Sequence, residues 1–168
     1  MIDLLPHPQT PSGAVSGVQA EAARGPQGLS LRYRIEADLE RLRIPPPRAP
    51  AIGERLWRHF CCEAFVGPAA GAAYHEFNFS PSGEWAAYAF RRYREGEAWR
   101  SPDPRIEVRR NARVLELFAG IPAPAGRLRV ALCAVIEEGD GALSYWALRH
   151  AAGKPDFHHP DAFALEIE

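Results

Sequence analysis

Hydrophobic and polar residues alternate in short runs along most of the chain, and this period of two is typical of strands with one buried face. The clearest runs begin at Leu29 and at Leu128, where every second side chain is apolar. About ten short strands are expected, without helices between them. Those with definable limits are Val15–Ala23, Leu29–Ala37, Leu56–Val66, Tyr74–Phe79, Trp85–Tyr93, Arg113–Ala119, Leu128–Glu137, Leu143–Arg149 and Phe163–Ile167.

Glycine and proline separate these runs, with 14 glycines and 16 prolines among 168 residues. Gly25–Gly28 divides the first two expected strands, and the prolines of Ile44–Pro50 indicate a loop or a polyproline segment. Helix-like patterns are weak and limited to Leu39–Leu42 and Arg92–Trp99. Many closely spaced strands predict an all-β fold, an antiparallel β-sandwich, with residues 1–168 forming a single domain.

The best-defined hairpin is centred on Ser80-Pro81-Ser82-Gly83, which has the residue preferences of a type I turn. With Pro81 and Ser82 at the tip, Phe79 should face Glu84. One face should then carry Tyr74, Glu76, Asn78, Trp85, Ala87, Ala89 and Arg91, and the core face His75, Phe77, Phe79, Ala86, Tyr88 and Phe90. The side chains expected to be largely buried are Phe60, Cys62, Phe77, Phe79, Tyr88, Phe90, Leu117, Leu132 and Trp146.

The first of these two faces combines aromatic rings, a carboxylate, an amide and an arginine above small alanines. Such a surface suits a sugar, because a ring can stack on its C–H face while polar groups fix its hydroxyls. Trp57, His59 and Glu63 would join this face if their strand is a neighbour. The alternative is an ordinary solvated or loop-covered side of the sheet. The predicted ligand-binding residues are Trp57, Glu63, Glu76, Asn78, Trp85 and Arg91.

Charge and cysteine content restrict the function classes. A net charge of -1 argues against a nucleic-acid or anionic-membrane partner, since both require a clustered positive field. The start of the chain lacks the pattern of a signal peptide, and no apolar run approaches the ~18 residues of a membrane span. Three cysteines give no disulfide framework, and the adjacent Cys61 and Cys62 should point to opposite sides of a strand. A reduced, cytoplasmic protein is expected.

Several motifs together resemble the bacterial DOMON-like proteins, which are relatives of the family 9 carbohydrate-binding modules. They are Leu56-Trp57, Cys62-Glu63-Ala64-Phe65-Val66, the segment from Tyr74 to Gly83, Ser144–Leu148 and Pro155–His158. The resemblance extends over nearly the whole chain. It implies a β-sandwich, and members of this superfamily bind sugars or haem, or have no assigned ligand.

No cofactor, metal or catalytic group is expected. Haem-binding relatives use a methionine with histidine or lysine, and here Met1 and Lys154 are the sole residues of their kinds. Bis-histidine ligation among His59, His75, His150 and His158 stays open. Asp156–Asp161 contains metal-ligating residue types, but its spacing matches no common zinc motif. Glu63 and Glu76 could form the carboxylate pair of a glycosidase if they lay close together.

The sequence therefore predicts a non-catalytic domain that binds a small polar ligand, and the favoured ligand is a saccharide or a sugar derivative. A protein–protein interaction module is the first alternative, and a cryptic sugar-processing enzyme is the second. A homodimer stays open as an oligomeric state.

Overall fold

The computed structural model describes residues 1–26 and 28–168, which form strands joined by loops and short 3-10 helices. The strands are β1 (Ile2–Pro6), β2 (Val15–Gly25), β3 (Gly28–Ala37), β4 (Cys61–Pro68), β5 (Tyr74–Phe79), β6 (Trp85–Arg92), β7 (Glu95–Ala98), β8 (Glu107–Arg110), β9 (Val114–Ile121), β10 (Leu128–Glu137), β11 (Leu143–Ala147) and β12 (Leu165–Ile167). The 3-10 helices are η1 (Leu39–Arg41), η2 (Leu56–Arg58) and η3 (Pro160–Ala162). In this described part, no helix is long and apolar enough to cross a membrane.

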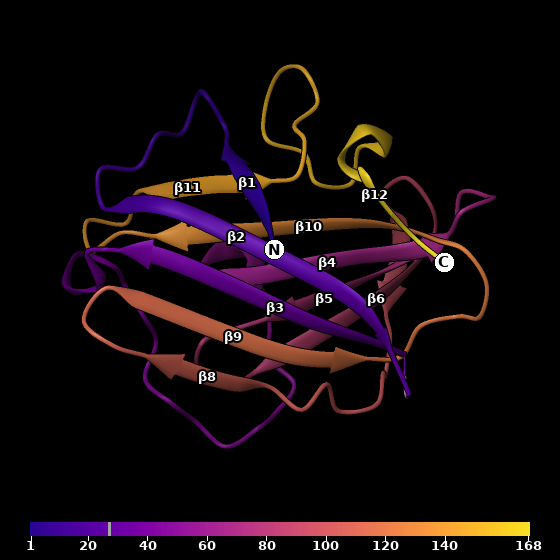
Figure 1. Cartoon of the computed structure of the whole chain (residues 1–168), viewed down its shortest axis with the longest axis horizontal. Helices are drawn as coiled ribbons and strands as arrows, with labels where there is room; N and C mark the ends of the chain where they lie inside the picture. Colours follow the sequence, from indigo (N-terminus) through magenta and orange to yellow (C-terminus); the bar gives the residue numbers. More distant parts are fainter. Residues whose placement is uncertain (27) are drawn as a thin grey trace.

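The strands pair antiparallel in the order β7-β6-β5-β4-β10-β11-β1-β2-β3-β9-β8, and β12 adds to the free half of β10. Figure 1 shows β2, β3, β9 and β8 lying across a second layer that contains β10, β4, β5 and β6. The short strand β1 joins the two layers, because Ile2–Leu4 pair with β2 while Leu5 and Pro6 pair with β11. The predicted all-β sandwich is confirmed.

The main core lies between the two layers and is built from alternate residues of their facing strands. From the first layer it takes Val18, Leu31, Tyr33, Ile35, Leu115 and Leu117, and from the second Cys62, Ala64, Val66, Phe77, Phe79, Val130 and Leu132. The Tyr33 hydroxyl donates a 2.7 Å hydrogen bond across this core to the carbonyl of Glu63. Phe60, Cys62, Phe77, Phe79, Leu117, Leu132 and Trp146 are buried as predicted.

A smaller apolar cluster covers the opposite, outer face of the second layer. It contains Phe65, Tyr74, Ala131, Cys133, Val135, Ala147, Phe157 and Ala162. Phe157 and Ala162 come from the segment after β11, which folds back over β4, β5 and β10. Both faces of β4 and β10 are therefore buried along almost their whole length. Any polar side chain on the outer face of β4 must consequently be desolvated.

The predicted register of the β5–β6 hairpin is wrong by one residue. Gly83 donates its N–H to the Ser80 carbonyl over 3.0 Å, which confirms a β-turn over Ser80–Gly83. Gly83 then adopts a φ of 94°, and the Ser80 N–H bonds to the carbonyl of Glu84. This arrangement is a G1 bulge, which adds one residue to the second strand. Phe79 consequently pairs with Trp85 instead of Glu84.

The extra residue exchanges the two faces of β6. Trp85 and Ala87 enter the main core, whereas Ala86, Tyr88 and Phe90 lie on the outer face with Glu76. Tyr88 and Phe90 are half-buried there, so their predicted place in the core is wrong. The predicted place of Trp85 on the polar face is wrong for the same reason.

Other differences concern the limits of elements. Arg92–Trp99 contains the strand β7 instead of a helix, and Leu56–Val66 begins as the 3-10 helix η2 before β4 starts at Cys61. The short strands β1, β7 and β8 were not predicted. The expected turn Gly25–Gly28 includes Gln27, which lies outside the described residues.

Paired truncations on β6 test the register. Trp85→Ala should lower the free energy of unfolding by ~3–5 kcal/mol, because Trp85 is 6% exposed within the main core. Tyr88→Ala should cost clearly less, since its side chain is half-buried on the outer face. Urea unfolding of both variants gives the comparison. A larger loss for Tyr88→Ala than for Trp85→Ala would contradict the bulged hairpin.

Candidate ligand-binding site

The floor of the candidate site is formed by the outer faces of β4 and β5. Because side chains alternate along a strand, Glu63 points away from the main core between Cys62 and Ala64. Glu76 and Asn78 do the same on β5, and Asn78 pairs directly with Glu63 across the two strands. Glu76 is the diagonal neighbour of Glu63, at a separation that long side chains can bridge. All three residues are at least 95% removed from solvent.

Above this floor lies a cavity of about 350 Å³. Its walls are mostly aromatic and come from six separate parts of the chain, namely η2, β6, the β6–β7 turn, β10, β11 and the segment after β11. The lining residues are Trp57, Glu63, Glu76, Tyr88, Phe90, Arg94, Val135, Tyr145, Pro155, Phe157 and His158. The Trp57 ring meets the Tyr88 ring edge-on with 5.7 Å between centroids, and Trp57 is 39% exposed. The cavity is therefore open to a ligand beside Trp57.

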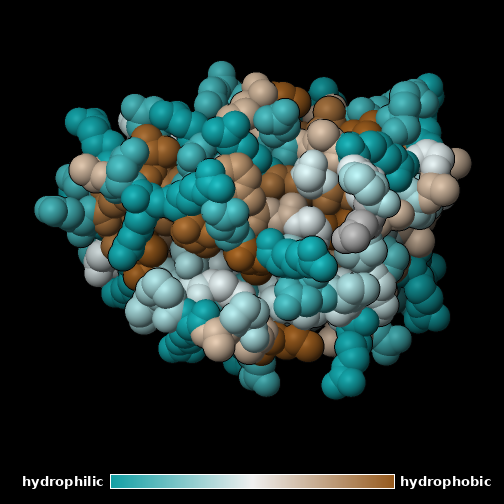
Figure 2. Space-filling model, turned by 60° about the horizontal axis from the view of Figure 1, so that its bottom comes forward, coloured by the Kyte–Doolittle hydropathy of each residue, from teal (hydrophilic) through white to brown (hydrophobic). Residues whose placement is uncertain are grey.

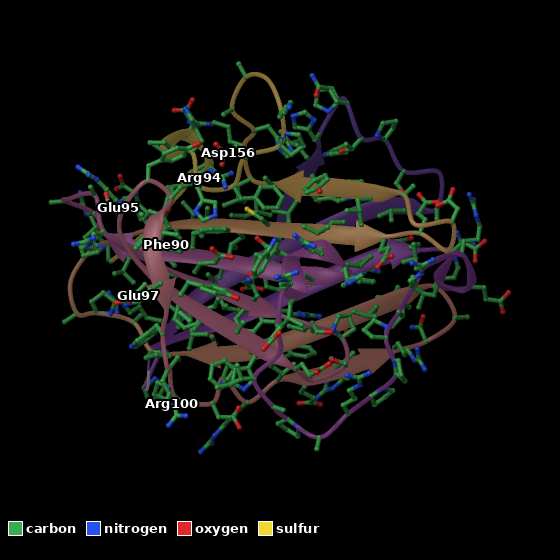
Figure 3. All side chains as sticks on the ribbon, turned by 180° about the vertical axis from the view of Figure 1, so that it is seen from behind. Phe90, Arg94, Glu95, Glu97, Arg100 and Asp156 are labelled. Carbon is green, nitrogen blue, oxygen red and sulfur yellow. The ribbon has the colours of Figure 1, made fainter. Side chains whose placement is uncertain are left out.

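Asp156 ties the segment after β11 to the β6–β7 turn. Its carboxylate accepts hydrogen bonds from the Tyr93 hydroxyl at 2.6 Å and from the Arg94 guanidinium at 2.8 Å. It also accepts the backbone N–H of His158 at 3.1 Å. Figure 3 shows Arg94 and Asp156 side by side, where the two segments meet above Phe90. These donors lower the pKa of Asp156 against the effect of its partial burial, so the carboxylate stays charged.

His158 is held against the floor by this arrangement. Its ring lies 5.0 Å from the rings of both Phe65 and Phe90, measured between centroids. Burial, followed by the charge of Arg94, lowers the pKa of His158 to about 4, so the imidazole is neutral near pH 7.

The hydrogen bonds of His158 determine which nitrogen carries its proton. The Tyr74 hydroxyl lies 2.8 Å from Nδ1 of His158 and accepts the backbone N–H of Arg94. Tyr74 is therefore free to donate its own hydrogen to Nδ1, which leaves the ring proton on Nε2. That nitrogen faces Oε2 of Glu76 at 3.5 Å.

The carboxyls on the floor are incompletely satisfied. Oε1 of Glu76 accepts a 2.9 Å hydrogen bond from the Asn78 amide, but Oε1 of Glu63 and Oδ1 of Asn78 have no partner among the described residues. Burial raises the pKa of Glu76 to about 7, although Asn78 and Arg94 both act to lower it. Burial and then the neighbouring Glu76 raise the pKa of Glu63 well above its ordinary value. A buried acceptor without a donor is costly, which indicates that the floor is built to receive one.

The structure brings together four of the six predicted site residues. Trp57, Glu63 and Glu76 line the cavity, and Asn78 lies beside them on the floor. Trp85 faces the opposite side of the sheet. The Arg91 side chain is 84% exposed and forms a 3.1 Å ion pair with Glu95, away from the cavity.

Sequence reasoning missed the remaining lining residues for two reasons. Tyr88 and Phe90 were assigned to the wrong face by the register error, and the glycine at the last position of the turn, Gly83, was the signal for a G1 bulge. Arg94, Tyr145, Phe157 and His158 reach the cavity through tertiary packing, which no local pattern records. Among the described residues, no group of three or more histidine, cysteine or acidic side chains is arranged to hold a metal ion.

The opposed pKa shifts of Glu76 and His158 predict opposite effects of pH on two variants. A carboxyl whose pKa rises on folding from 4.5 to about 7 stabilises the fold at low pH and loses that contribution as pH increases through 7. Relative to wild type, Glu76→Gln should therefore gain stability from pH 4.5 to pH 7. The gain should not exceed about 3 kcal/mol, since one pKa unit corresponds to about 1.4 kcal/mol.

His158→Gln should behave in the opposite way. The pKa of His158 falls on folding from 6.5 to about 4, so its contribution is complete above 6.5 and is lost as pH decreases through 4. The variant should gain stability relative to wild type as pH decreases across that range. Urea unfolding at several pH values measures both differences. Parallel profiles for wild type and the two variants would refute the described environments of these side chains.

Comparison with known proteins supports the fold. No family model and no curated protein matches the chain. A crystal structure from Bacteroides uniformis, named a "putative carbohydrate-binding protein", superposes with a TM-score of 0.69 at 16% sequence identity. The match covers 99% of this chain and 83% of that one. At this identity the similarity establishes a shared fold.

Proposed function

We propose that this protein binds a small polar ligand, a saccharide, in the cavity over β4 and β5 and does not convert it. One observation carries the proposal, namely that Glu63 Oε1 and Asn78 Oδ1, buried at the floor of an aromatic cavity, have no partner in the described part of the chain. Hydroxyl groups of a sugar supply the missing donors. A volume of about 350 Å³ is near the lower end of small-molecule sites, ~300–1,000 Å³, and so favours a mono- or disaccharide.

Each part of the cavity has a role in this proposal. Trp57 and Tyr88 stack on the C–H face of a sugar ring, since aromatic rings provide an apolar surface of suitable shape. Glu63, Glu76 and Asn78 bond to vicinal hydroxyls, and Arg94 or His158 contacts a ring or hydroxyl oxygen. Each hydrogen bond gives a net ~0.5–1.5 kcal/mol, so the affinity should be micromolar to millimolar.

Two independent similarities support the same proposal. The structural neighbour from Bacteroides uniformis is named for carbohydrate binding. The motifs around Trp57, Glu63 and Glu76 resemble DOMON-like proteins, and we extend the proposal to membership of that group.

A protein-contact role would require a flat apolar patch. Figure 2 shows polar side chains between the apolar groups of one face, near β8.

Calorimetry with a panel of mono- and disaccharides tests the proposed function. At least one sugar should bind to the wild type, and Trp57→Ala should weaken it about fivefold, the equivalent of ~1 kcal/mol of stacking. Arg91→Ala is the matched control, because this exposed side chain lies away from the cavity and should leave the affinity unchanged. Binding that Arg91→Ala abolishes and Trp57→Ala preserves would place the site elsewhere. The absence of any sugar binding would refute the proposal.

Glycoside hydrolysis is a second candidate, favoured by the presence of Glu63 and Glu76 in one cavity. A glycosidase needs one protonated and one ionised carboxyl. Burial raises the pKa of both carboxyls, that of Glu76 to about 7, so near pH 7 one member of the pair can be protonated while the other is ionised. Incubation with chromogenic glycosides at pH 8 decides this. Hydrolysis that is lost in Glu76→Gln would establish an enzyme, whereas its absence leaves binding alone.

A further inference from the structure

We propose that the preferred ligand is a saccharide with a free amino group, whose ammonium is bound between Glu63, Glu76 and Asn78. The inference rests on the proposed function and adds the charge of the ligand to it. Three features support it: the charge balance of the cavity, the excess of acceptors on its floor and the aromatic character of its walls.

The charges around the cavity leave the two carboxyls without a cation. Among the described residues that line the cavity, Arg94 is the one arginine or lysine, and its guanidinium pairs with Asp156 at 2.8 Å. Within the described part of the chain, neither Glu63 nor Glu76 lies within ion-pair distance of an arginine or lysine. His158, at 3.5 Å from Glu76, is neutral near pH 7. A positive ligand group would supply the counter-charge that the chain does not provide.

The hydrogen-bonding groups of the floor match an ammonium better than a hydroxyl. An ammonium donates three hydrogen bonds and accepts none, whereas a hydroxyl does both. Among the described residues, Glu63 Oε1 and Asn78 Oδ1 have no hydrogen-bond partner, and both can only accept once Glu63 has released its proton; Asn78 is fully buried. The Asn78 amide already donates to Glu76, so its carbonyl is the end that stays available. An ammonium reaching both atoms and Glu76 would satisfy three acceptors at once.

The walls are suited to the same group. Trp57, Tyr88, Phe90, Tyr145 and Phe157 line the cavity. The faces of aromatic rings attract a cation, and the attraction is greatest where water is excluded. The remainder of an amino sugar presents C–H groups to the same rings.

The groups around Glu76 determine how pH affects this binding. Two of these groups carry charge near pH 7, namely Arg94 on the β6–β7 turn and Asp156 on the segment after β11. The other groups are neutral near pH 7, because burial raises the pKa of the thiols and phenols and lowers the pKa of the imidazole. They are Cys61, Tyr74, Tyr88, Cys133, Tyr145 and His158. The carboxyls Glu63 and Glu76 are thus the groups of the floor that must lose protons when a cation binds.

Calorimetry with glucosamine, glucose and N-acetylglucosamine tests the inference. At pH 7 glucosamine should bind to the wild type at least tenfold more tightly than the two neutral sugars. Its affinity should increase at least fivefold from pH 6 to pH 7, because Glu76 with a pKa of about 7 ionises over that range and any ionisation of Glu63 adds to the increase. At pH 6, titrations in buffers of different ionisation enthalpy should show release of about one proton with glucosamine if Glu76 alone ionises, up to two if Glu63 ionises with it, and none with glucose.

Two variants locate the preference. Glu63→Gln keeps the shape of the side chain and removes its ability to ionise, so it should reduce the ratio of glucosamine to glucose affinity at least fivefold. Arg91→Ala, remote from the cavity, should leave that ratio unchanged. If Glu63→Gln does not fold, Glu76→Gln provides the same comparison, and the proton release of the wild type needs no variant.

The outcomes separate the inference from the proposed function. Equal binding of glucose, N-acetylglucosamine and glucosamine, without proton release, overturns the amino-sugar inference and leaves saccharide binding intact. Binding of none of these sugars, nor of any other in the wider panel, overturns both. Preference for glucosamine that persists unchanged in both glutamate variants would also overturn the inference, because the charge would then be recognised elsewhere.

Discussion

The burial of two carboxyl groups on one outer face of the sandwich is the constraint on which the site depends. Glu63 and Glu76 lie on strands whose other face forms the main core, so they cannot turn inward without exposing Cys62, Ala64 or Phe77. Isolated buried charges are unfavourable, and proteins normally pair them or keep them neutral. Among the described residues, their polar neighbours are the Asn78 amide, the neutral imidazole of His158, the Arg94 guanidinium that Asp156 already binds, and each other. Burying these groups without enough donors costs folding free energy, and a ligand that donates hydrogen bonds to them would reduce that cost.

The segment after β11 converts this polar strip into a cavity. Asp156 joins it to Tyr93 and Arg94, and the same carboxylate fixes the backbone of His158. With the segment in place, Phe157 and His158 form a wall and remove water from the floor. The raised pKa of Glu76 and the lowered pKa of His158 are therefore two consequences of one packing event. Binding and stability should be linked through this segment.

Much of the fold could be predicted from alternation alone. The period of two in Leu29–Ala37 and Leu128–Glu137 correctly indicated strands, and β4 was given the correct inward and outward faces. The prediction correctly grouped Glu63, Glu76 and Asn78. These residues precede the Ser80–Gly83 turn, and the register error affects only the strand that follows it. Alternation did not predict the strands β1, β7 and β8, because each has at most five residues and its hydrophobic and polar side chains alternate little.

The rest of the site depended on one backbone detail and on contacts distant in sequence. A single bulge at Gly83 moved Trp85 into the core and brought Tyr88 to the cavity. Arg94 and Asp156 are 62 residues apart, and no local sequence pattern around either residue predicts their ion pair. Local patterns thus predicted which strand face is polar, but the closure of that face into a cavity required the three-dimensional structure.

The protonation of the two floor carboxyls is the property from which the account follows, and carbon-13 NMR of the glutamate side chains measures it directly. In the ligand-free protein, the Glu76 carboxyl should titrate near pH 7 and Glu63 well above the ordinary range of a glutamate. Glu63→Gln and Glu76→Gln assign the two signals by their loss. Titration of both carboxyls near the ordinary value of about 4.3 would show that the floor is solvated, and would contradict the account.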